Sequence, residues 1–252
     1  MTLIGATSPP AALATAKAVA GLTVSVCIPA RDEAATVAGV VAPVLALMHG
    51  AHRLVDEVIV VDDGSLDATG DIAASLGARV LRRTGPPGKG AAMAEAGREA
   101  DGDIVVFLDA DVTNFVPHFV TRLLAPLLSD HDIMLVKGVY HRSLDGVAGE
   151  GGRVTELLAR PLLERLFPSL AFVRQPLAGE VAIRRRALDE LVLETGYGVE
   201  VGMLIDVAAS HGPAAIAQAD LGERAHRNRP LAELSDQARQ VLAAVLDRVT
   251  AT

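Results

Sequence analysis

The chain is poor in cysteine, aromatic residues and basic residues, and each shortage argues against a class of protein. One Cys among 252 residues excludes an intramolecular disulfide framework and a Cys-rich zinc site, and it fits a reducing compartment. Aromatic residues make up 3% and Trp is absent, which argues against a lectin-like module built on stacked aromatic platforms. Lys and Arg number 23 against 31 Asp and Glu, giving a net charge of −8, so we expect no nucleic-acid partner.

Long hydrophobic runs are also missing. The most apolar stretch, 37–48, is interrupted by a Gly and a Pro and is shorter than the ~20 residues that span a bilayer. The segment 1–22 lacks the basic start of a signal peptide and has two consecutive prolines where an apolar stretch would run. We therefore expect a cytoplasmic protein without a membrane partner, with a flexible Ala-rich arm over 1–22 and a single domain over 23–252.

From residue 23 onward, short β-branched runs alternate with helical patterns. Strands are predicted at 23–28, 57–62, 78–83 and 103–111, and helices at 33–48, 67–76 and 88–100. Successive strand–helix units predict an α/β fold whose doubly wound, mostly parallel sheet carries helices on both faces. The second half is less regular, with strands predicted at 132–140, 180–185 and 214–221, and helices at 154–166 (kinked near Pro161), 201–210 and 234–249.

A polar cluster follows each of the first four predicted strands. The clusters are Pro29-Ala30-Arg31-Asp32-Glu33, Asp62-Asp63-Gly64-Ser65, Gly85-Pro86-Pro87-Gly88-Lys89-Gly90 and Asp109-Ala110-Asp111. Open α/β sheets bind ligands outside the carboxyl ends of their strands, where the strand order reverses. The four clusters therefore predict one ligand-binding edge.

Asp109 and Asp111 place two carboxylates at the end of an apolar strand, which is unfavourable unless a cation binds there. Carboxylates completed by substrate phosphates are typical of Mg²⁺ or Mn²⁺ sites. The alternative is that Asp111 only caps a turn or a helix start.

Asp63 can accept a hydrogen bond from the imide N–H of a uracil base, although Asp, Gly and Ser are also ordinary turn formers. The Gly-rich loop is not a P-loop, because Arg83 stands where that motif needs its first Gly and Gly90 where it needs Ser or Thr. The loop instead brings Lys89 to a helix N-terminus, where a diphosphate can bind.

The motifs P-A-R-D-E, V-V-D-D-G-S-x-D, G-K-G and L-D-A-D, in this order, resemble those of nucleotide-diphospho-sugar glycosyltransferases of the GT-A fold. The second half is similar to the glucosyl-3-phosphoglycerate synthase family in the segments 151–157, 177–180, 196–200 and 224–228. The resemblance implies transfer of glucose from UDP-glucose to 3-phosphoglycerate with retention of configuration. It also implies a homodimer.

The same resemblance implies a role for individual residues. Those that would bind the nucleotide sugar are Pro29, Ala30, Arg31, Glu33, Asp63, Lys89, Asp109, Ala110, Leu177, Tyr197 and Glu200. Asp109, Asp111 and Glu200 would be catalytic, and Asp111 and His226 would hold the metal. Gly152, Arg153, Thr155 and Asn228 would bind the phosphorylated acceptor. An Arg at a helix start independently favours an anion, whereas the run Arg184–Arg186 fits a solvated surface.

Three alternatives to this function stay open on the sequence. The first is a GT-A glycosyltransferase with a different acceptor. The second is a sugar-1-phosphate nucleotidyltransferase, which would carry a Gly-rich basic loop after its first strand, where 29–33 has no Gly and ends acidic. The third is a non-catalytic sensor of nucleotide sugars.

Overall fold

A computed structural model describes residues 3–4, 9–144, 147–149, 152–225 and 231–250. The strands are β1 Leu3–Ile4, β2 Val24–Ala30, β3 Glu57–Asp62, β4 Arg79–Arg82, β5 Ile104–Phe107, β6 Leu135–Leu144, β7 Val147–Gly149, β8 Val181–Arg184 and β9 Ile216–Glu223. The α-helices are α1 Pro10–Ala20, α2 Val37–His49, α3 Thr69–Leu76, α4 Lys89–Glu99, α5 His118–Ser129, α6 Arg160–Leu166, α7 Arg185–Leu188, α8 Val199–His211 and α9 Leu231–Thr250. Shorter helical turns are η1 Thr155–Ala159, η2 Pro168–Leu170 and η3 Pro213–Ala215.

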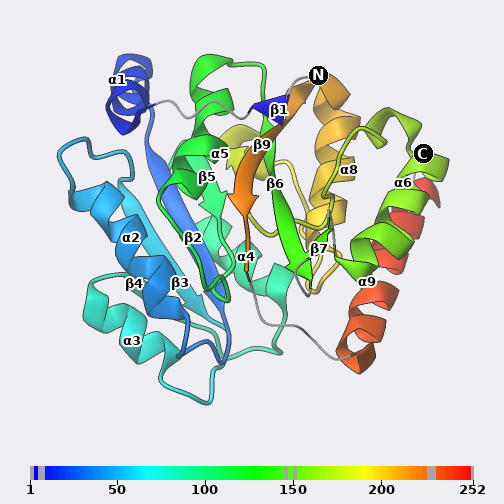
Figure 1. Ribbon diagram of the computed structural model, residues 1–252, viewed down its shortest axis with the longest axis horizontal. Coiled ribbons are helices and arrows are strands. Elements are labelled where there is room, and N and C mark those ends of the chain that lie inside the picture. The colour runs from blue at the N-terminus through cyan, green and yellow to red at the C-terminus, as the bar shows by residue number, and fades with distance from the viewer. Residues whose placement is uncertain (1–2, 5–8, 145–146, 150–151, 226–230, 251–252) are drawn as a thin grey trace.

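The strands form one mixed sheet in the order β1-β9-β6-β8-β5-β2-β3-β4, and β7 pairs with β6 (Figure 1). β2 lies parallel to both β3 and β5, whereas β8 runs antiparallel to its neighbours β5 and β6. The chain proceeds outward from β2 through β3 to β4 and then returns to add β5 on the other side of β2. The predicted doubly wound, mostly parallel sheet is confirmed, and its strand order reverses beside β2.

Helices cover both faces of the sheet because successive side chains of the central strands point to opposite faces. Val24, Val26 and Ile28 of β2 pack with the residues of α2 and α5. Cys27, from the same strand, faces α4, α8 and α9 on the other side. β2 is thereby buried from Val24 to Ile28, which fixes the position of the loop at its carboxyl end.

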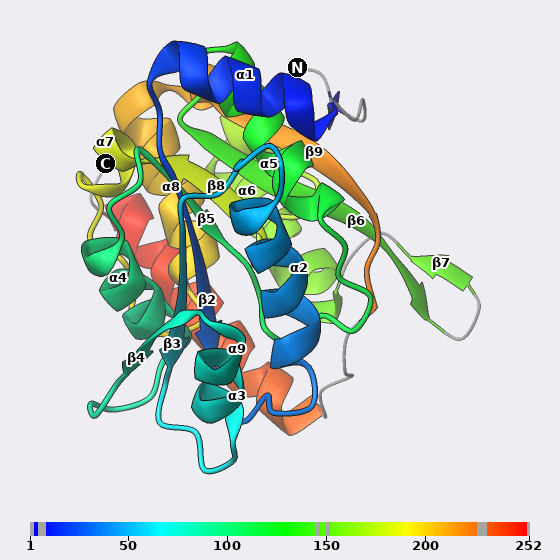
Figure 2. The same cartoon turned by 90° about the vertical axis from the view of Figure 1, so that its left-hand side faces the viewer.

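Part of the segment 1–22, for which we expected a flexible arm, is helical. Residues 10–20 form α1, and Leu3–Ile4 pair with β9. Figure 2 shows α1 lying beside α5. The Lys17 side chain is buried and its Nζ lies 2.5 Å from the Asp56 carboxylate. The signals for this helix are present in the sequence, since Pro10 stands in its first turn and Gly21 ends it in the left-handed conformation with φ 65°.

The predicted helix 154–166 begins as the π-helical turn η1 and continues as α6. Pro161 has no N–H to donate, so a regular α-helical hydrogen bond cannot form there, and the wider turn precedes it. The predicted strand 103–111 also ends early. β5 stops at Phe107, so Asp109 and Asp111 lie in the loop that follows.

The run Arg184–Arg186 is not simply solvated, in contrast to the prediction. Arg184 is buried and donates to the carbonyl oxygens of Leu127 and Asp130, and Arg185 donates to those of Gly97 and Ala100. Because each guanidinium satisfies backbone carbonyls at the ends of neighbouring helices, the run has a structural role.

Candidate active site

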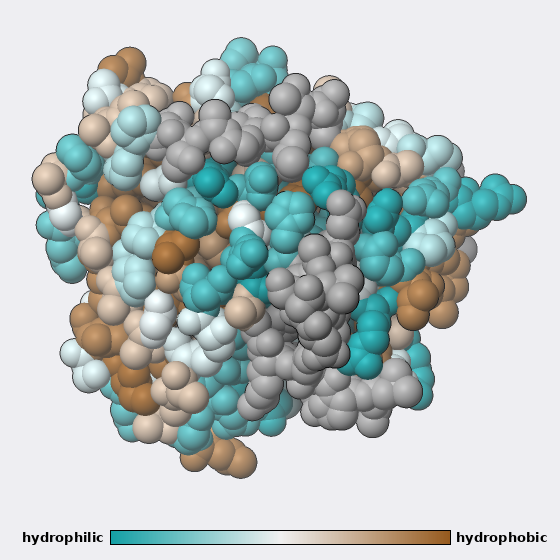
Figure 3. Space-filling view, in the orientation of Figure 1, coloured by the Kyte–Doolittle hydropathy of each residue, from teal (hydrophilic) through white to brown (hydrophobic). Residues whose placement is uncertain are grey.

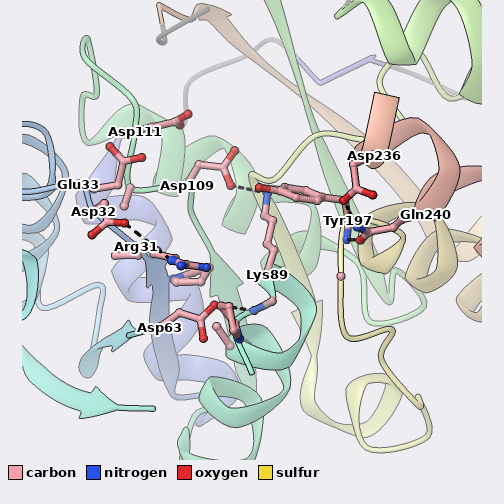
Figure 4. A pocket seen from close by; sticks show the side chains of 17 residues that line it. Arg31, Asp32, Glu33, Asp63, Lys89, Asp109, Asp111, Tyr197, Asp236 and Gln240 are labelled. Carbon is pink, nitrogen blue, oxygen red and sulfur yellow. Dashed lines mark hydrogen bonds and ion pairs between the residues drawn. The ribbon is translucent and has the colours of Figure 1, made fainter. Parts of the chain in front are cut away.

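A pocket of about 670 Å³ opens at the carboxyl edge of the sheet, beside β2 where the strand order reverses. The predicted residues that line it are Pro29, Ala30, Arg31, Glu33, Asp63, Lys89, Asp109, Ala110, Asp111 and Tyr197. Figure 4 shows Arg31, Asp32 and Asp63 on one side of the pocket, Tyr197, Asp236 and Gln240 on the other, and Lys89 and Asp109 between them. On the face of the molecule seen in Figure 3, hydrophilic residues cover much of the middle and hydrophobic ones are scattered toward the margins.

The carboxylates of Asp109 and Asp111 converge on one cation, which is Arg224. The Arg224 Nη2 lies 2.7 Å from an Asp109 oxygen and 3.2 Å from an Asp111 oxygen. The backbone of Gly179 packs against Asp109 so closely that an added Cβ would lie 2.2 Å from its oxygen. The Asp109 and Asp111 carboxylates lie close enough together to contact the same guanidinium. Carboxylate oxygens are the ligands that Mg²⁺ and Mn²⁺ prefer, so these two residues fit such an ion.

Arg224 also binds Glu180, a carboxylate that is completely buried. Their closest atoms, Nε and Oε1, lie 2.8 Å apart. Burial raises the pKa of Glu180, against the opposing pull of the guanidinium. Burial lowers the pKa of Arg224, but Glu180 and the nearby aspartates raise it by more, so Arg224 stays charged. Asp109 and Asp111 are therefore supported from beneath by the buried ion pair of Arg224 and Glu180.

Lys89 lies at the start of α4 and connects Asp109 to α8. Its Nζ lies 2.6 Å from an Asp109 oxygen and 2.6 Å from an oxygen of the buried Glu200. Burial opposes its charge, but these two carboxylates raise the pKa of Lys89 above the ordinary value. Glu200 therefore reaches the pocket through Lys89, although it is not one of the residues that line the pocket.

Asp63 has both of its oxygens engaged in the structure. One oxygen pairs with Arg83, and the other accepts a hydrogen bond from the Gly88 N–H at 2.7 Å. Arg83 also pairs with Glu95 of α4 at 3.1 Å. Each carboxylate oxygen has a second lone pair, so Asp63 can accept a further hydrogen bond from a bound base.

The loop after β2 is held by the loop after β3. Asp32, which has φ 55°, accepts a hydrogen bond from the Leu66 N–H at 2.8 Å, and its own N–H donates to the Ser65 hydroxyl. The N–H of Glu33 donates to the Thr69 hydroxyl at 2.8 Å. Sequence reasoning assigned no role to Asp32, which also lines the pocket.

Three of the predicted acceptor-binding residues, Gly152, Arg153 and Thr155, are described by the structure and lie outside the pocket lining. Gly152 and the exposed Arg153 begin the helical run that contains η1, and Thr155 is buried in its first turn. η1 packs against α9, which lines the pocket. Leu177 is half-buried and lies two residues before Gly179, which packs against Asp109. His226 and Asn228 lie outside the described residues.

Several residues at the site had no role in the sequence prediction. Gly196, Asp236 and Gln240 line the pocket, and Arg224 and Lys137 lie beneath it. The Lys137 Nζ donates to the Ala178 carbonyl at 2.7 Å, and burial lowers the pKa of Lys137 to about 8. Local motifs did not identify these residues because their contacts join segments that are distant in sequence.

Another group of possible metal ligands, among the residues that the structure describes, is Asp130, His131 and Asp132. These residues are exposed and precede β6, so they lie at the opposite edge of the sheet from the pocket. None of the helices within the described ranges has the length and apolarity to cross a membrane.

Comparison with known proteins places this site in a family. The model of glycosyl transferase family 2 matches residues 25–192. The glucosyl-3-phosphoglycerate synthase of Mycobacterium tuberculosis (strain CDC 1551 / Oshkosh) is 49% identical over an alignment that covers 91% of this chain and 74% of the relative. The chain belongs to the glucosyl-3-phosphoglycerate synthase family. A synthase of the same name from Petrotoga mobilis is 38% identical, with 90% of this chain and 73% of the relative covered.

Solved structures of the synthase family share the whole fold. A crystal structure of glucosyl-3-phosphoglycerate synthase from Mycobacterium tuberculosis in complex with Mn²⁺, UDP-glucose and phosphoglyceric acid superposes with a TM-score of 0.90 at 45% identity. The superposition covers 99% of this chain and 86% of the other. The predicted GT-A fold and family are thereby confirmed.

Proposed function

We propose that this protein transfers glucose from UDP-glucose to 3-phosphoglycerate, giving glucosyl-3-phosphoglycerate and UDP. The observation that carries the proposal is the convergence of Asp109 and Asp111 on one cation, beside Lys89, in a pocket at the strand-order reversal. The 49% identity to a synthase of this name supports the same substrates. The chain is accordingly a hexosyltransferase.

The nucleotide sugar would lie across the carboxyl edge of the sheet. In this proposal Pro29, Ala30, Arg31 and Glu33 line the nucleoside end, and Asp63 accepts the imide N–H of uracil. Arg83 and the Gly88 N–H support this role because they hold the carboxylate in place. Lys89, next to the α4 N-terminus, would meet the diphosphate, since both a cation and free N–H groups favour phosphate there.

Asp111 and His226 would hold the divalent metal, and Asp109 belongs to the same motif. When bound, Mg²⁺ or Mn²⁺ supplies positive charge to the diphosphate as it leaves. Arg224 is paired with both carboxylates and keeps two negative groups together in the protein itself. Lys89 stays charged near the same oxygens and offsets the charge that develops on the leaving group.

The acceptor would bind beside the hexose. Arg153 can hold the phosphate of 3-phosphoglycerate in a two-pronged contact, with Gly152, Thr155 and Asn228 nearby in the proposed site. The exposure of Arg153 at the start of the helical run and the packing of η1 against α9 support this position.

Leu177, Tyr197 and Glu200 would surround the glucose, and Glu200 would act through its contact with Lys89. We propose retention of the anomeric configuration, as in the resembled family. The ¹H NMR coupling of the product's anomeric proton tests this, because an α-linked product from the α-linked donor shows retention and a β-linked product contradicts it.

We further propose a homodimer in the cytoplasm. An apolar stripe on α9, formed by Leu242, Leu246 and Val249 at helical spacing, supports self-association, and the single buried Cys fits a reducing compartment. Light scattering during size exclusion tests the dimer, and a monomer at micromolar concentration contradicts it.

The test of the function is a matrix of donors and acceptors with Mg²⁺ and with Mn²⁺. UDP-, GDP- and ADP-glucose are combined with 3-phosphoglycerate, glycerol 3-phosphate or no acceptor, and UDP, pyrophosphate and glycoside are measured. Release of UDP that depends on 3-phosphoglycerate supports the proposal. In a parallel reaction with UTP and glucose 1-phosphate, release of pyrophosphate indicates a nucleotidyltransferase, and the absence of any product in all reactions indicates a binding protein.

A further inference from the structure

The loop 194–198 joins the start of α4 to the C-terminal helix α9. On the α4 side, the Ala91 N–H donates to the Thr195 carbonyl at 2.9 Å, and a Cβ at Gly90 would lie 1.7 Å from the Glu194 carbonyl. The loop therefore packs directly against the helix turn that carries Lys89.

On its other side the loop contacts Gln240 of α9. The Tyr197 N–H donates to the Gln240 Oε1 at 2.8 Å, and the Gln240 Nε2 donates to an Asp236 oxygen at 2.7 Å. These two bonds fix which end of the carboxamide faces the loop, because an acceptor must meet the N–H and a donor must meet the carboxylate. A Cβ at Gly196 would lie 1.9 Å from the Gln240 Oε1.

α9 is fixed in this position by a second contact, two turns further along. Arg248 reaches Asp206 of α8 through two hydrogen bonds of 2.7 Å, and Glu194 at 2.8 Å. The Asp206 and Glu194 carboxylates raise the pKa of Arg248 although burial opposes its charge. Gln240 and Arg248 therefore hold the 194–198 loop from the same helix face.

Figure 4 shows that Gln240, Asp236 and Tyr197 lie across the pocket from Arg31 and Asp63. Lys89 and Asp109 lie between the two groups. If the base binds near Asp63 and the diphosphate near Lys89, the next part of the donor, the hexose, reaches the Tyr197 side.

We propose that Gln240 is a positioning residue for the hexose end of the donor pocket. Its carboxamide fixes the Gly196–Tyr197 backbone, which sets the Tyr197 side chain and the start of α8 with Glu200. The inference rests on the proposed UDP-glucose transfer, and it assigns a function to α9 that sequence motifs do not indicate.

The test compares Gln240→Leu with Gln237→Leu, a matched change on the same helix at a residue that does not line the pocket. Calorimetry measures Kd for UDP and for UDP-glucose with Mn²⁺, and initial rates give kcat and KM. For Gln240→Leu we expect a Kd for UDP within twofold of wild type and a kcat/KM for UDP-glucose at least tenfold lower. Gln237→Leu should match wild type in both measurements.

Two further variants separate positioning from folding. Asp236→Asn combined with Gln240→Glu keeps an acceptor for the Tyr197 N–H and reverses the bond between positions 236 and 240, so it should recover most of the activity lost in Gln240→Leu. Gly196→Ala should reproduce the loss, because its Cβ displaces the carboxamide. If Gln240→Leu does not fold, the same two measurements, the Kd for UDP and the kcat/KM for UDP-glucose, are made on these two variants instead.

The proposal is overturned if Gln240→Leu has the same kcat/KM for UDP-glucose as wild type, or if its affinity for UDP falls as much as its affinity for UDP-glucose. It is also overturned if the variant that combines Asp236→Asn with Gln240→Glu recovers no activity. A wild-type protein that binds neither UDP nor UDP-glucose would instead refute the proposed function itself.

Discussion

Replacing Arg224 by Met should destabilise the protein strongly, because three carboxylates share its guanidinium. Glu180 is fully buried and Arg224 is 5% exposed, so the variant leaves a buried negative charge without its cation. Removing one partner of a buried ion pair costs about 3–5 kcal/mol. Asp109 keeps Lys89 as a partner, and both aspartates are nearer to solvent, so most of this cost arises at Glu180.

A second substitution makes this prediction quantitative. Glu180→Met combined with Arg224→Met removes the unpaired charge, and apolar replacements of a buried pair are often neutral. The double variant should therefore lie within about 2 kcal/mol of wild type, giving a coupling energy of at least ~1–3 kcal/mol. Strictly additive effects would show that Glu180 and Arg224 do not stabilise each other.

The loss of unfolding free energy in Arg224→Met should also depend on pH. Burial already raises the pKa of Glu180 above 4.5, and removing Arg224 raises it further. A carboxyl whose pKa is raised on folding binds its proton more tightly in the folded state, so its contribution to stability falls as pH rises above 4.5. The free-energy difference between wild type and Arg224→Met should therefore shrink toward acid.

The assay is urea unfolding followed by circular dichroism, in EDTA so that bound metal does not contribute. Arg165→Met on α6, an exposed Arg, is the matched control and should change the free energy of unfolding by less than ~0.5 kcal/mol. A cost below ~1 kcal/mol for Arg224→Met, or a cost that grows toward acid, would refute this account of the buried ion pair.

Four further changes test individual residues. Asp111→Ala should nearly abolish transfer, since several kcal/mol of charge stabilisation are lost, and wild type should stop in excess EDTA and recover with Mn²⁺; full turnover in EDTA contradicts the metal assignment. Asp63→Asn should weaken UDP binding by ~1.5–3 kcal/mol in calorimetry and lower Tm because Arg83 keeps only Glu95 of its two carboxylate partners; unchanged binding would leave Asp63 a purely structural residue. Arg153→Ala should raise the KM for 3-phosphoglycerate at least tenfold at constant donor KM, with partial recovery in Arg153→Lys, and an equal effect on both substrates would count against it. Cys27, whose thiol pKa is raised by burial, should react with Ellman's reagent only after unfolding, and rapid labelling of the native protein contradicts its burial.

The central sheet was predictable because its information is local. A short, continuous apolar run such as 57–62 is typical of a strand that is buried on both faces of a parallel sheet. The structure has β3 at these residues. The polar clusters after β2, β3 and β5 meet in one pocket because parallel strands end at the same edge.

The local sequence signals for the N-terminal helix α1 are weaker than those for the central sheet. Pro10 in the first turn and Gly21 beyond the last are ordinary helix boundaries, but the Ala-rich stretch between them lacks an obvious apolar face. Tertiary contacts of Lys17 with the segment 53–56 stabilise it, and these cannot be seen in the helix sequence alone.

The support of the site was beyond prediction from motifs. Arg224 meets Asp109 across more than a hundred residues of chain, and Gln240 meets Tyr197 from the last helix. Each contact needs the complete fold, since no spacing rule connects the partners. Lining residues such as Asp63 and Lys89 could therefore be predicted from the sequence, whereas the ion pairs of Arg224 and the contact of Gln240 with the 194–198 loop required the structure.

The most direct test of the central claim is one reaction, with UDP-glucose, 3-phosphoglycerate and Mn²⁺ added to the purified protein and the products identified by mass spectrometry. The account predicts equal amounts of UDP and a phosphoglycerate that is heavier by one hexose residue, and neither product without Mn²⁺ or without 3-phosphoglycerate. UDP formed at the same rate with or without 3-phosphoglycerate, and no hexosylated phosphoglycerate, would contradict it.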